Sequence, residues 1–303
     1  MTVKHLNAAR VAAVAAGALT RHGRTILRRK ESNAMTQNLP PLLLIGCGKM
    51  GGAMLAGWLE QGLPAQSVVV EPHAAATAAF AGRVRVVASI ADIPPGFAPA
   101  AVILATKPQE AGHVLPLLAP LVAGAPVFIS IMAGRNIAGM AAALGGAARI
   151  VRAMPNTPAA IRQGFTVACA GPGVSAEQRA LTDRLLTAIG EAAWVEDEGL
   201  IDPVTAVSGG GPAYVFLLAE VMEAAAIAQG LPADLARRMA RSTVAGSGAL
   251  LGASTEDAGQ LRRNVTSPKG TTERALAVLM AEWPDSMNRA IAAATARSRE
   301  LAG

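Results

Sequence analysis

Short apolar runs alternate with stretches of helical periodicity over the first two thirds of the chain. The runs cover residues 42–45, 67–70, 101–105, 127–131 and 149–154, and turn-forming residues follow each of them. Strands that alternate with helices in this way are typical of a parallel sheet with helices on both faces. The pattern therefore predicts an α/β fold that opens with a Rossmann-type, doubly wound parallel sheet.

The pattern changes near residue 195, where long Ala- and Leu-rich stretches replace the alternation. Helical periodicity covers 215–229, 233–251, 260–264, 273–280 and a last stretch from Asp285 toward the end. No strand pattern interrupts these stretches, so we expect this part of the chain to be all-helical. The predicted division is a nucleotide-binding domain at 37–195 and a helical domain at 196–303.

The composition is that of a well-packed globular protein, with 52% hydrophobic and 16% charged residues. The apolar faces in the helical part are extensive, whereas a domain of roughly 100 residues buries its surface inefficiently when it folds alone. We therefore expect a dimerisation domain, through which the protein forms a homodimer or a higher homo-oligomer.

The net charge of +6 belongs to the first 34 residues. They hold seven Lys or Arg and one acid, so the remaining 20 of the 27 basic residues balance the remaining 20 of the 21 acidic ones. Nucleic-acid-binding proteins need a basic excess on the folded body, so we expect no nucleic-acid partner. No apolar run reaches about 18 residues without Gly, Pro or a charge, and we expect no membrane span.

Residues 1–36 have three interpretations. An apolar run at 11–19 follows Lys4 and Arg10 and resembles the core of a signal peptide, although no good cleavage site comes after it. The Arg-rich, acid-poor composition also suits a transit peptide. Alternatively, Met35 is the true start, seven residues before the first predicted strand. Each interpretation makes 1–36 a poorly ordered or non-native extension.

The sequence contains two cysteines, Cys47 in a glycine-rich turn and Cys169 in an apolar run. Neither has the CxxC or Cys/His spacing of a metal site, and the pair does not indicate a disulfide scaffold. We therefore expect no metal, and a cytoplasmic protein in a reducing setting.

The turn after the first predicted strand carries the spacing G-x-G-x-x-G, with Gly46, Gly48 and Gly51. In a strand–turn–helix context the first glycine makes the tight turn, the second lets the backbone approach a pyrophosphate, and the third lets strand and helix pack closely. The phosphates then meet free N–H groups at the helix N-terminus, here at Lys49 and Met50. This loop predicts a dinucleotide cofactor.

Glu71 ends the second predicted strand, 20 residues after Gly51. An acid at this position usually accepts a hydrogen bond from the ribose 2′-OH of NAD, whereas it repels the 2′-phosphate of NADP. Arg83 and Arg85 lie close enough in sequence to reach such a phosphate. Both NAD and NADP therefore remain open, and the charge of Glu71 favours NAD.

Three further strand tips are expected to lie at the nicotinamide end of the cofactor. Ligands of parallel α/β sheets bind outside the carboxyl ends of the strands. The tips are the loops 106–109, 132–134 and 155–158, which are rich in Pro, Gly and Asn. Each of them is also typical of an ordinary turn.

Over about residues 40–300 the chain resembles the pyrroline-5-carboxylate reductases. The resemblance rests on the glycine loop and on ATKPQ at 105–109, RAMPNTP at 152–158, SGGGPAY at 208–214 and VTSPKGTT at 265–272. The last two motifs are the most specific. The resemblance implies reduction of 1-pyrroline-5-carboxylate to L-proline, the last step of proline biosynthesis, by hydride transfer from NADPH or NADH.

The resemblance also implies roles for individual residues. The substrate carboxylate would bind at Ser267, Gly270, Thr271 and Thr272, and a Pro-Lys-Gly turn that opens a helix suits an anion on its own merits. Glu198 matches a position near the nicotinamide or the proline ring. The matched cofactor-lining positions are Ala105, Thr106, Lys107, Pro108, Met132 and Ala133.

The reaction needs little from a protein acid. A pyrroline nitrogen that enters protonated is already electrophilic, so positioning of the nicotinamide against the imine carbon does most of the work. No residue is assigned as a catalytic acid. Thr205, Glu256 and Asp257 are candidates for polar contacts, although the composition favours their interpretation as a buried hydroxyl and solvated helix-cap acids.

Four positions depart from the family pattern. Lys269 stands where the family usually has Gly, Gly210 where Ser is common, Met132 where a smaller residue is common, and Glu71 where a small polar residue often lies. These departures concern cofactor preference and substrate affinity more than the class of reaction.

Two alternatives have the same domain plan. A β-hydroxyacid dehydrogenase depends on a Lys within its helical domain, but Lys269 is the only Lys after Lys107 and lies in a predicted loop. A nucleotide-binding homologue without enzyme activity would have no need of an intact substrate loop, although the departure at Lys269 keeps this alternative open.

Overall fold

The computed structural model of the protein describes residues 38–302. The predicted extension at 1–36 lies outside these residues. From Pro40 onward the described chain forms one compact unit.

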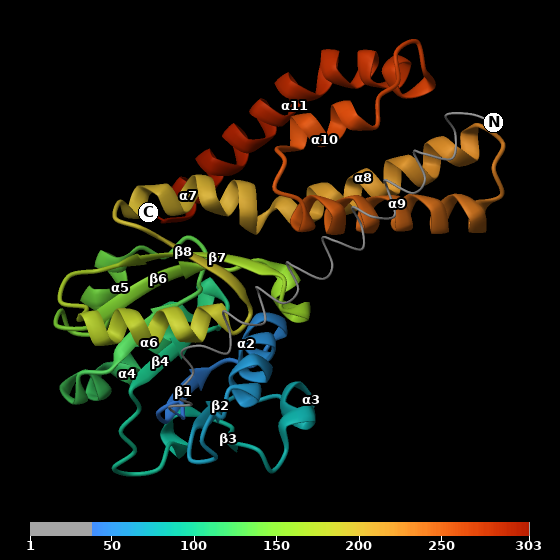
Figure 1. Ribbon diagram of the computed structural model, residues 1–303. Coiled ribbons are helices and arrows are strands. Elements are labelled where there is room, and N and C mark those ends of the chain that lie inside the picture. The colour runs from blue at the N-terminus through green and yellow to red at the C-terminus, as the bar shows by residue number, and fades with distance from the viewer. Residues whose placement is uncertain (1–37, 303) are drawn as a thin grey trace. The chain divides into compact units, whose positions relative to one another are not determined.

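A single eight-stranded sheet holds the first part of this unit together, with strand order β3-β2-β1-β4-β5-β6-β7-β8 (Figure 1). The order reverses between β1 and β4, as in a doubly wound fold. The predicted Rossmann-type sheet is therefore confirmed. The strands are β1 Leu42–Ile45, β2 Val68–Val70, β3 Arg85–Val87, β4 Ala101–Leu104, β5 Val127–Ser130, β6 Arg149–Met154, β7 Gly164–Ala170 and β8 Gly190–Val195.

The sheet departs from the predicted parallel arrangement at one place. β7 runs antiparallel to β6, and β8 then runs parallel to β7. The reason is the short link between β6 and β7, which contains only the 3-10 turn Thr157–Ile161. A parallel pair needs a crossover of a dozen or more residues, so the chain turns straight back.

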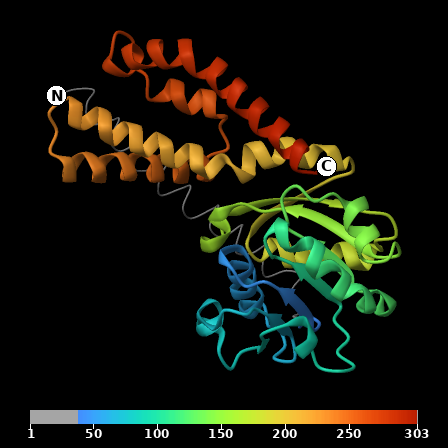
Figure 2. The same ribbon diagram turned by 180° about the vertical axis from the view of Figure 1, so that it is seen from behind.

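Helices cover both faces of the sheet (Figures 1 and 2). One face carries α2 and α6, which contact each other, and the opposite face carries α4 and α5. Between the layers, strand residues such as Leu43, Val102 and Phe128 are fully buried. The helices are α2 Lys49–Glu60, α3 Ala74–Thr77, α4 Ala111–Leu118, α5 Ile137–Ala143 and α6 Ala176–Thr187.

From residue 198 onward the described residues form helices and turns without a strand, as predicted. A short 3-10 turn, η6 Glu198–Leu200, precedes α7 Ile201–Val204 and a π-helical turn, η7 Thr205–Gly209. The longer helices are α8 Gly211–Ala228, α9 Ala233–Ala253, α10 Ala258–Asn264 and α11 Thr271–Ala302, with α8 and α9 packed side by side (Figure 1).

The two predicted helical stretches at 273–280 and from Asp285 are in fact one helix. α11 is 32 residues long and continues through Pro284. A proline removes one helical hydrogen bond and crowds the carbonyl four residues earlier, which is why the sequence indicates a break there. The long apolar and alanine-rich stretches on both sides sustain the helix.

The helical part exposes many large apolar side chains. α8 has no buried residue, and its Phe216 and Leu217 are more than half exposed. Trp283 of α11 is about half exposed. The run Glu198–Ala228 is also long and apolar enough to pass a length-and-composition criterion for a membrane-spanning helix, which the sequence did not lead us to expect. Helices that present such faces from a compact protein are typical of a subunit interface.

Candidate active site

The glycine loop lies between β1 and α2, and its shape depends on two glycines. Gly46 has a φ of 91°, and a Cβ there would lie 2.9 Å from the Ala105 carbonyl oxygen. A Cβ on Gly51 would overlap the Gly46 carbonyl oxygen. Side chains are therefore excluded at both positions, which lets β1, β4 and the start of α2 approach one another closely.

The third glycine faces open space. A Cβ on Gly48 would meet no atom within 4 Å. Gly48 is also the N-cap of α2, which has no acidic residue in its first turn. The first N–H groups of a helix have no partner within the helix, so those of Lys49, Met50 and Gly51 are suited to an anion. The loop therefore fits the phosphates of a dinucleotide.

Glu71 follows β2 and reaches back to this loop. Its Oε2 accepts the Cys47 N–H at 2.8 Å, and its Oε1 accepts the His73 N–H at 3.0 Å. The His73 ring Nδ1 lies 3.1 Å from the same Oε1. Burial raises the pKa of Glu71, but these hydrogen bonds outweigh it and leave the pKa below the ordinary value of 4.5. Glu71 is therefore held as an anion beside the loop.

The loops after β4 and β5 are brought together. The Thr106 hydroxyl contacts the Met132 Sδ at 3.7 Å, and the Arg135 Nε donates to the Pro108 carbonyl at 3.1 Å. Met132 is buried, and its N–H donates to the Ser130 Oγ at the end of β5. Ala105 directly follows β4. The predicted cofactor-lining positions at 105–108 and 132–133 therefore form one continuous edge of the sheet.

The loop after β5 also approaches the end of α11. Gly134 has a φ of 66°, and a Cβ there would lie 2.8 Å from the Cβ of Leu301. The last turns of the described chain therefore pack against a loop predicted to line the nicotinamide end.

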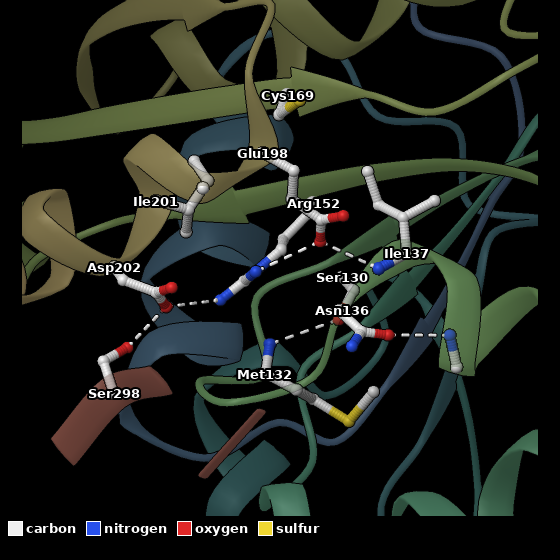
Figure 3. Close-up of polar contacts among 12 residues, drawn as sticks. Ser130, Met132, Asn136, Ile137, Arg152, Cys169, Glu198, Ile201, Asp202 and Ser298 are labelled. Carbon is white, nitrogen blue, oxygen red and sulfur yellow. Dashed lines mark hydrogen bonds and ion pairs between the residues drawn. The ribbon is translucent and has the colours of Figure 1, made fainter. Parts of the chain in front are cut away.

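A buried charge cluster lies beside this edge (Figure 3). Arg152 on β6 has a side chain only 3% exposed, and it contacts two carboxylates. Its Nη1 donates to Glu198 Oε1 at 3.1 Å and its Nη2 to Asp202 Oδ1 at 3.4 Å. The Ile137 N–H also donates to Glu198 Oε1, at 2.8 Å, and the Ser298 hydroxyl to Asp202 Oδ1, at 2.8 Å. One guanidinium thus joins the sheet to η6 and α7, and Asp202 extends the cluster to α11 through Ser298.

A second contact joins the same segments. The Asn156 Nδ2 donates to the Ser208 Oγ at 3.2 Å, while its Oδ1 accepts the Phe165 N–H at 2.9 Å. The loop 155–158 therefore connects β6, β7 and the π-helical turn. The Thr205 hydroxyl donates to the Ile201 carbonyl at 2.7 Å, which supports its interpretation as a satisfied helical hydroxyl.

Gly210 is close to Tyr214. The Tyr214 hydroxyl donates to the Ala206 carbonyl at 2.9 Å, and a Cβ at Gly210 would lie 2.7 Å from the Tyr214 oxygen. A serine at this position would require the phenol ring to shift. The Tyr214 hydroxyl thus occupies the space that a side chain at position 210 would need.

The loop 267–272 is exposed and its contacts are local. The Gly270 N–H donates to the Ser267 carbonyl at 3.0 Å, and the Lys269 N–H to Glu273 Oε2 at 2.8 Å. Lys269 has a φ of 57°, in the left-handed region that favours glycine. Thr271 and Thr272 form the first turn of α11.

Glu256 and Asp257 have structural partners. Asp257 is the N-cap of α10 and accepts the Gln260 N–H at 2.7 Å, and Glu256 accepts the Asn264 side-chain amide at 3.0 Å. These contacts support the interpretation as helix-cap acids.

The glycine loop and the loop 267–272 are not brought together within one chain. α11 begins at Thr271, whereas its contacts with Asp202 and Gly134 come from Ser298 and Leu301, near its end. At a rise of 1.5 Å per residue, about 40 Å of helix separates Thr271 from Ser298.

The sequence motifs did not assign a role to Arg152, Asp202 or Ser298. One signal for Arg152 is present: a charged residue within the apolar strand 149–154 needs a buried partner. Its partners lie 46 and 50 residues further along the chain, and no sequence pattern identifies them.

The two cysteines are free and buried. Burial and the nearby Glu71 raise the pKa of Cys47 from its ordinary value of 9.0 to about 11. Burial, followed by the acidic groups of 196–198, also raises the pKa of Cys169. Within residues 38–302, no group of three or more His, Cys, Asp or Glu side chains is arranged to hold a metal ion.

Comparison with known proteins finds matches in both parts of the chain. Residues 198–301 match the family model "Pyrroline-5-carboxylate reductase dimerisation", and residues 42–134 match "NADP oxidoreductase coenzyme F420-dependent". The pyrroline-5-carboxylate reductase of Pseudomonas aeruginosa is 40% identical, over 87% of this chain and 97% of that protein.

Two solved structures support the same relationship. A pyrroline-5-carboxylate reductase from Coxiella burnetii has a TM-score of 0.81 at 31% identity, covering 88% of this chain and 100% of that one. The Plasmodium falciparum pyrroline carboxylate reductase, solved with NADP bound, has a TM-score of 0.74 at 26% identity, covering 87% of this chain and 98% of that one. On these grounds the chain belongs to the pyrroline-5-carboxylate reductase family.

Proposed function

We propose that this protein reduces the C=N bond of 1-pyrroline-5-carboxylate and produces L-proline, with NADPH or NADH as the hydride donor. The family membership of the whole described chain carries the proposal. It disfavours both a β-hydroxyacid dehydrogenase and a binding protein without activity. The protein acts as a homo-oligomer, because its helical part matches a dimerisation domain.

The glycine loop is the cofactor-binding element in this proposal. When bound, the nicotinamide cofactor supplies the hydride that the imine carbon receives. Gly46 and Gly51 shape the loop, Gly48 leaves it open, and the N–H groups of the first turn of α2 are suited to the phosphates. Ala105, Thr106, Lys107, Pro108, Met132 and Ala133 would line the nicotinamide half.

The loop 267–272 is the candidate carboxylate site. Ser267, Thr271 and Thr272 offer hydroxyl groups, and the start of α11 adds main-chain N–H groups and the positive end of a helix dipole. Lys269 brings an ammonium group to the same exposed loop. These groups suit an anion the size of a carboxylate.

A second copy of the chain would bring the two halves of the site together. We call the sheet edge formed by residues 105–108 and 132–133 the nicotinamide edge. Within one chain about 40 Å of α11 separates the loop 267–272 from the helix end that packs near this edge. A homodimer has a twofold axis, so each copy can offer its loop to the other. The exposed apolar faces of α8 and α11 are the surface on which such a dimer would form.

Glu198 is the candidate polar group at the reacting end. It belongs to a cluster of one arginine and two carboxylates, which together carry a net charge of −1. Its side chain is 28% exposed, so it is accessible to a ligand. A negative cluster stabilises a cationic neighbour, and a protonated pyrroline nitrogen is such a cation.

We place this reaction in the cytoplasm, because both cysteines are free thiols and a reducing compartment keeps thiols in that state. A reporter fused to the natural gene and followed by cell fractionation tests this placement. Recovery of the protein in an extracytoplasmic fraction would contradict it.

The central test uses purified protein that begins at Met35. It is mixed with 1-pyrroline-5-carboxylate and either NADH or NADPH, and the nicotinamide absorbance is followed. We expect oxidation of at least one cofactor with formation of proline. If neither cofactor is oxidised by folded, oligomeric protein, the proposed function is wrong.

A Thr272→Ala variant tests the carboxylate loop in the same assay. Loss of one hydrogen bond to the substrate should weaken binding by about 1–3 kcal/mol, seen as a higher KM for the pyrroline. Thr266→Ala is the matched control, because the Thr266 hydroxyl donates to the Arg262 carbonyl within the chain. An unchanged KM in Thr272→Ala would remove this hydroxyl from the site.

A further inference from the structure

Arg152 is the most deeply buried charge of the cluster at the nicotinamide edge. It pairs in register with Ser130, the last residue of β5. The Ser130 Oγ in turn accepts the Met132 N–H. Arg152 therefore lies beside the end of β5, from which the chain continues into the loop 132–134.

Arg152 holds one oxygen of Glu198 and leaves the other available. Nη1 of Arg152 and the Ile137 N–H both donate to Oε1 of Glu198. Among the described residues, Oε2 of Glu198 has no hydrogen-bond partner. The carboxylate is thus fixed by one oxygen, while the second can face a ligand.

The opposite side of the guanidinium is fixed as well. Nη2 contacts Asp202 Oδ1, which also accepts the Ser298 hydroxyl. Asp202 belongs to α7 and Ser298 to α11. Arg152, which is part of the sheet, is therefore also bound by a residue of the helical part. Its position then depends on both parts of the chain.

The cluster is unlike what the stability of the fold alone would require. Buried ion pairs are often no more stable than apolar residues of the same shape, because both charges lose their water. Here the Arg152 Nε is also buried without a hydrogen-bond partner among the described residues. Unsatisfied buried groups of this kind are rare in native proteins and mark positions where another requirement applies.

We infer that Arg152 is a positioning residue for the reduction: its Nη1 fixes Glu198 beside residues 132–134, while Asp202, which accepts the Ser298 hydroxyl, holds its Nη2. This inference rests on the proposed function. Arg152 itself need not touch substrate or cofactor. The consequence is that loss of Arg152 acts through Glu198 and affects turnover more than cofactor binding.

The experiment compares Arg152→Met, Arg152→Lys, Glu198→Gln and the double variant Arg152→Met/Glu198→Gln in the full-length oligomeric protein. Arg149→Met is the matched control, since Arg149 lies on the same strand and its side chain donates to the Ala125 carbonyl instead of to a carboxylate. Four quantities are measured: kcat and KM for the pyrroline, the Kd for NADPH from its fluorescence, and the melting temperature.

We expect Arg152→Met to lower kcat by up to about 100-fold, the loss that a misplacement of about 1 Å can cause. The Kd for NADPH should stay within about twofold of the unmodified protein. Arg152→Lys, which can hold one carboxylate at a time, should recover part of the loss. The double variant should be no worse than the poorer single variant, because both changes remove the same carboxylate from its place.

Three results would overturn the inference. One is a folded Arg152→Met with unchanged kcat, and another is a double variant whose losses multiply. The third is a loss of melting temperature with normal kinetics, which would make the role structural. If Arg152→Met does not fold, Arg152→Lys decides: an unchanged kcat overturns the inference. Failure of the unmodified protein to reduce the pyrroline would instead refute the proposed function. The NADPH fluorescence would show separately whether the cofactor still binds.

Discussion

The carboxylate of Glu71 accepts the main-chain N–H of Cys47 at 2.8 Å, and so ties the end of β2 to the middle of the glycine loop. The same carboxylate accepts the His73 N–H. Each carboxylate oxygen can accept more than one hydrogen bond, so a ribose hydroxyl can still be added. A second anion, such as a 2′-phosphate, would meet a group already held in its charged form.

Cofactor preference should therefore change when Glu71 is replaced. We expect Glu71→Ser to raise the ratio of kcat/KM for NADPH over NADH by about tenfold or more, because a like-charge repulsion is removed. Steady-state kinetics with each cofactor measures the ratio. Glu191→Ser, on the exposed side of β8, is the control for loss of one negative charge. An unchanged ratio would show that Glu71 does not face the adenosine ribose.

The stability of the glycine loop should depend on pH through Glu71. Its pKa lies below the ordinary 4.5 in the folded protein, so its stabilising effect is complete above that value and is lost as the pH falls through the folded pKa. We expect Glu71→Gln to lower the melting temperature at pH 7 and to lose this difference as the pH drops below 4.5. Thermal melts across this range measure it. A difference that grows on acidification would contradict the assignment.

The two thiols should be unreactive in the folded protein. A pKa of about 11 leaves Cys47 with roughly a hundredfold less thiolate than a thiol of pKa 9.0 at the same pH. We expect iodoacetamide at pH 8 to modify neither Cys47 nor Cys169, whose side chains are also buried. Intact mass measures the extent of alkylation, with the urea-unfolded protein as the control. Rapid labelling of the native protein would disprove the burial of these groups.

Lys269 should contribute both strain and charge to the carboxylate loop. Its left-handed backbone costs about 1–2 kcal/mol that glycine avoids, while its side chain adds a positive charge to the proposed carboxylate loop. We expect Lys269→Gly to keep or raise the melting temperature and to raise the KM for the pyrroline. The KM of the unmodified protein should rise with ionic strength, and that of the variant should rise less. Equal salt dependence in the two proteins would exclude a role for the charge.

Much of the cofactor domain could be predicted because its signals are local. The apolar run at 42–45 and the three glycines predict β1, the turn and α2, since strand, turn and helix follow one another directly along the chain. β3 was not predicted, because it is three residues long and largely exposed. β7 was not predicted either, because its pairing depends on the short return from β6.

The charge cluster shows where local signals end. The sequence places Arg152 in a strand and Glu198 in an acidic turn, but nothing in either pattern pairs them. Ser298 lies 96 residues beyond Asp202 and meets it only because α11 continues through Pro284. A prediction that divides this helix in two cannot bring its last turns back to the sheet.

The length of α11 has a genetic consequence. If each site takes its glycine loop from one copy and its 267–272 loop from the other, a chain damaged in the first loop and a chain damaged in the second can rescue each other. Each mixed dimer then contains one intact site, so random pairing of equal amounts should restore about a quarter of the normal activity. Two recessive alleles of one gene would behave as though they lay in different genes.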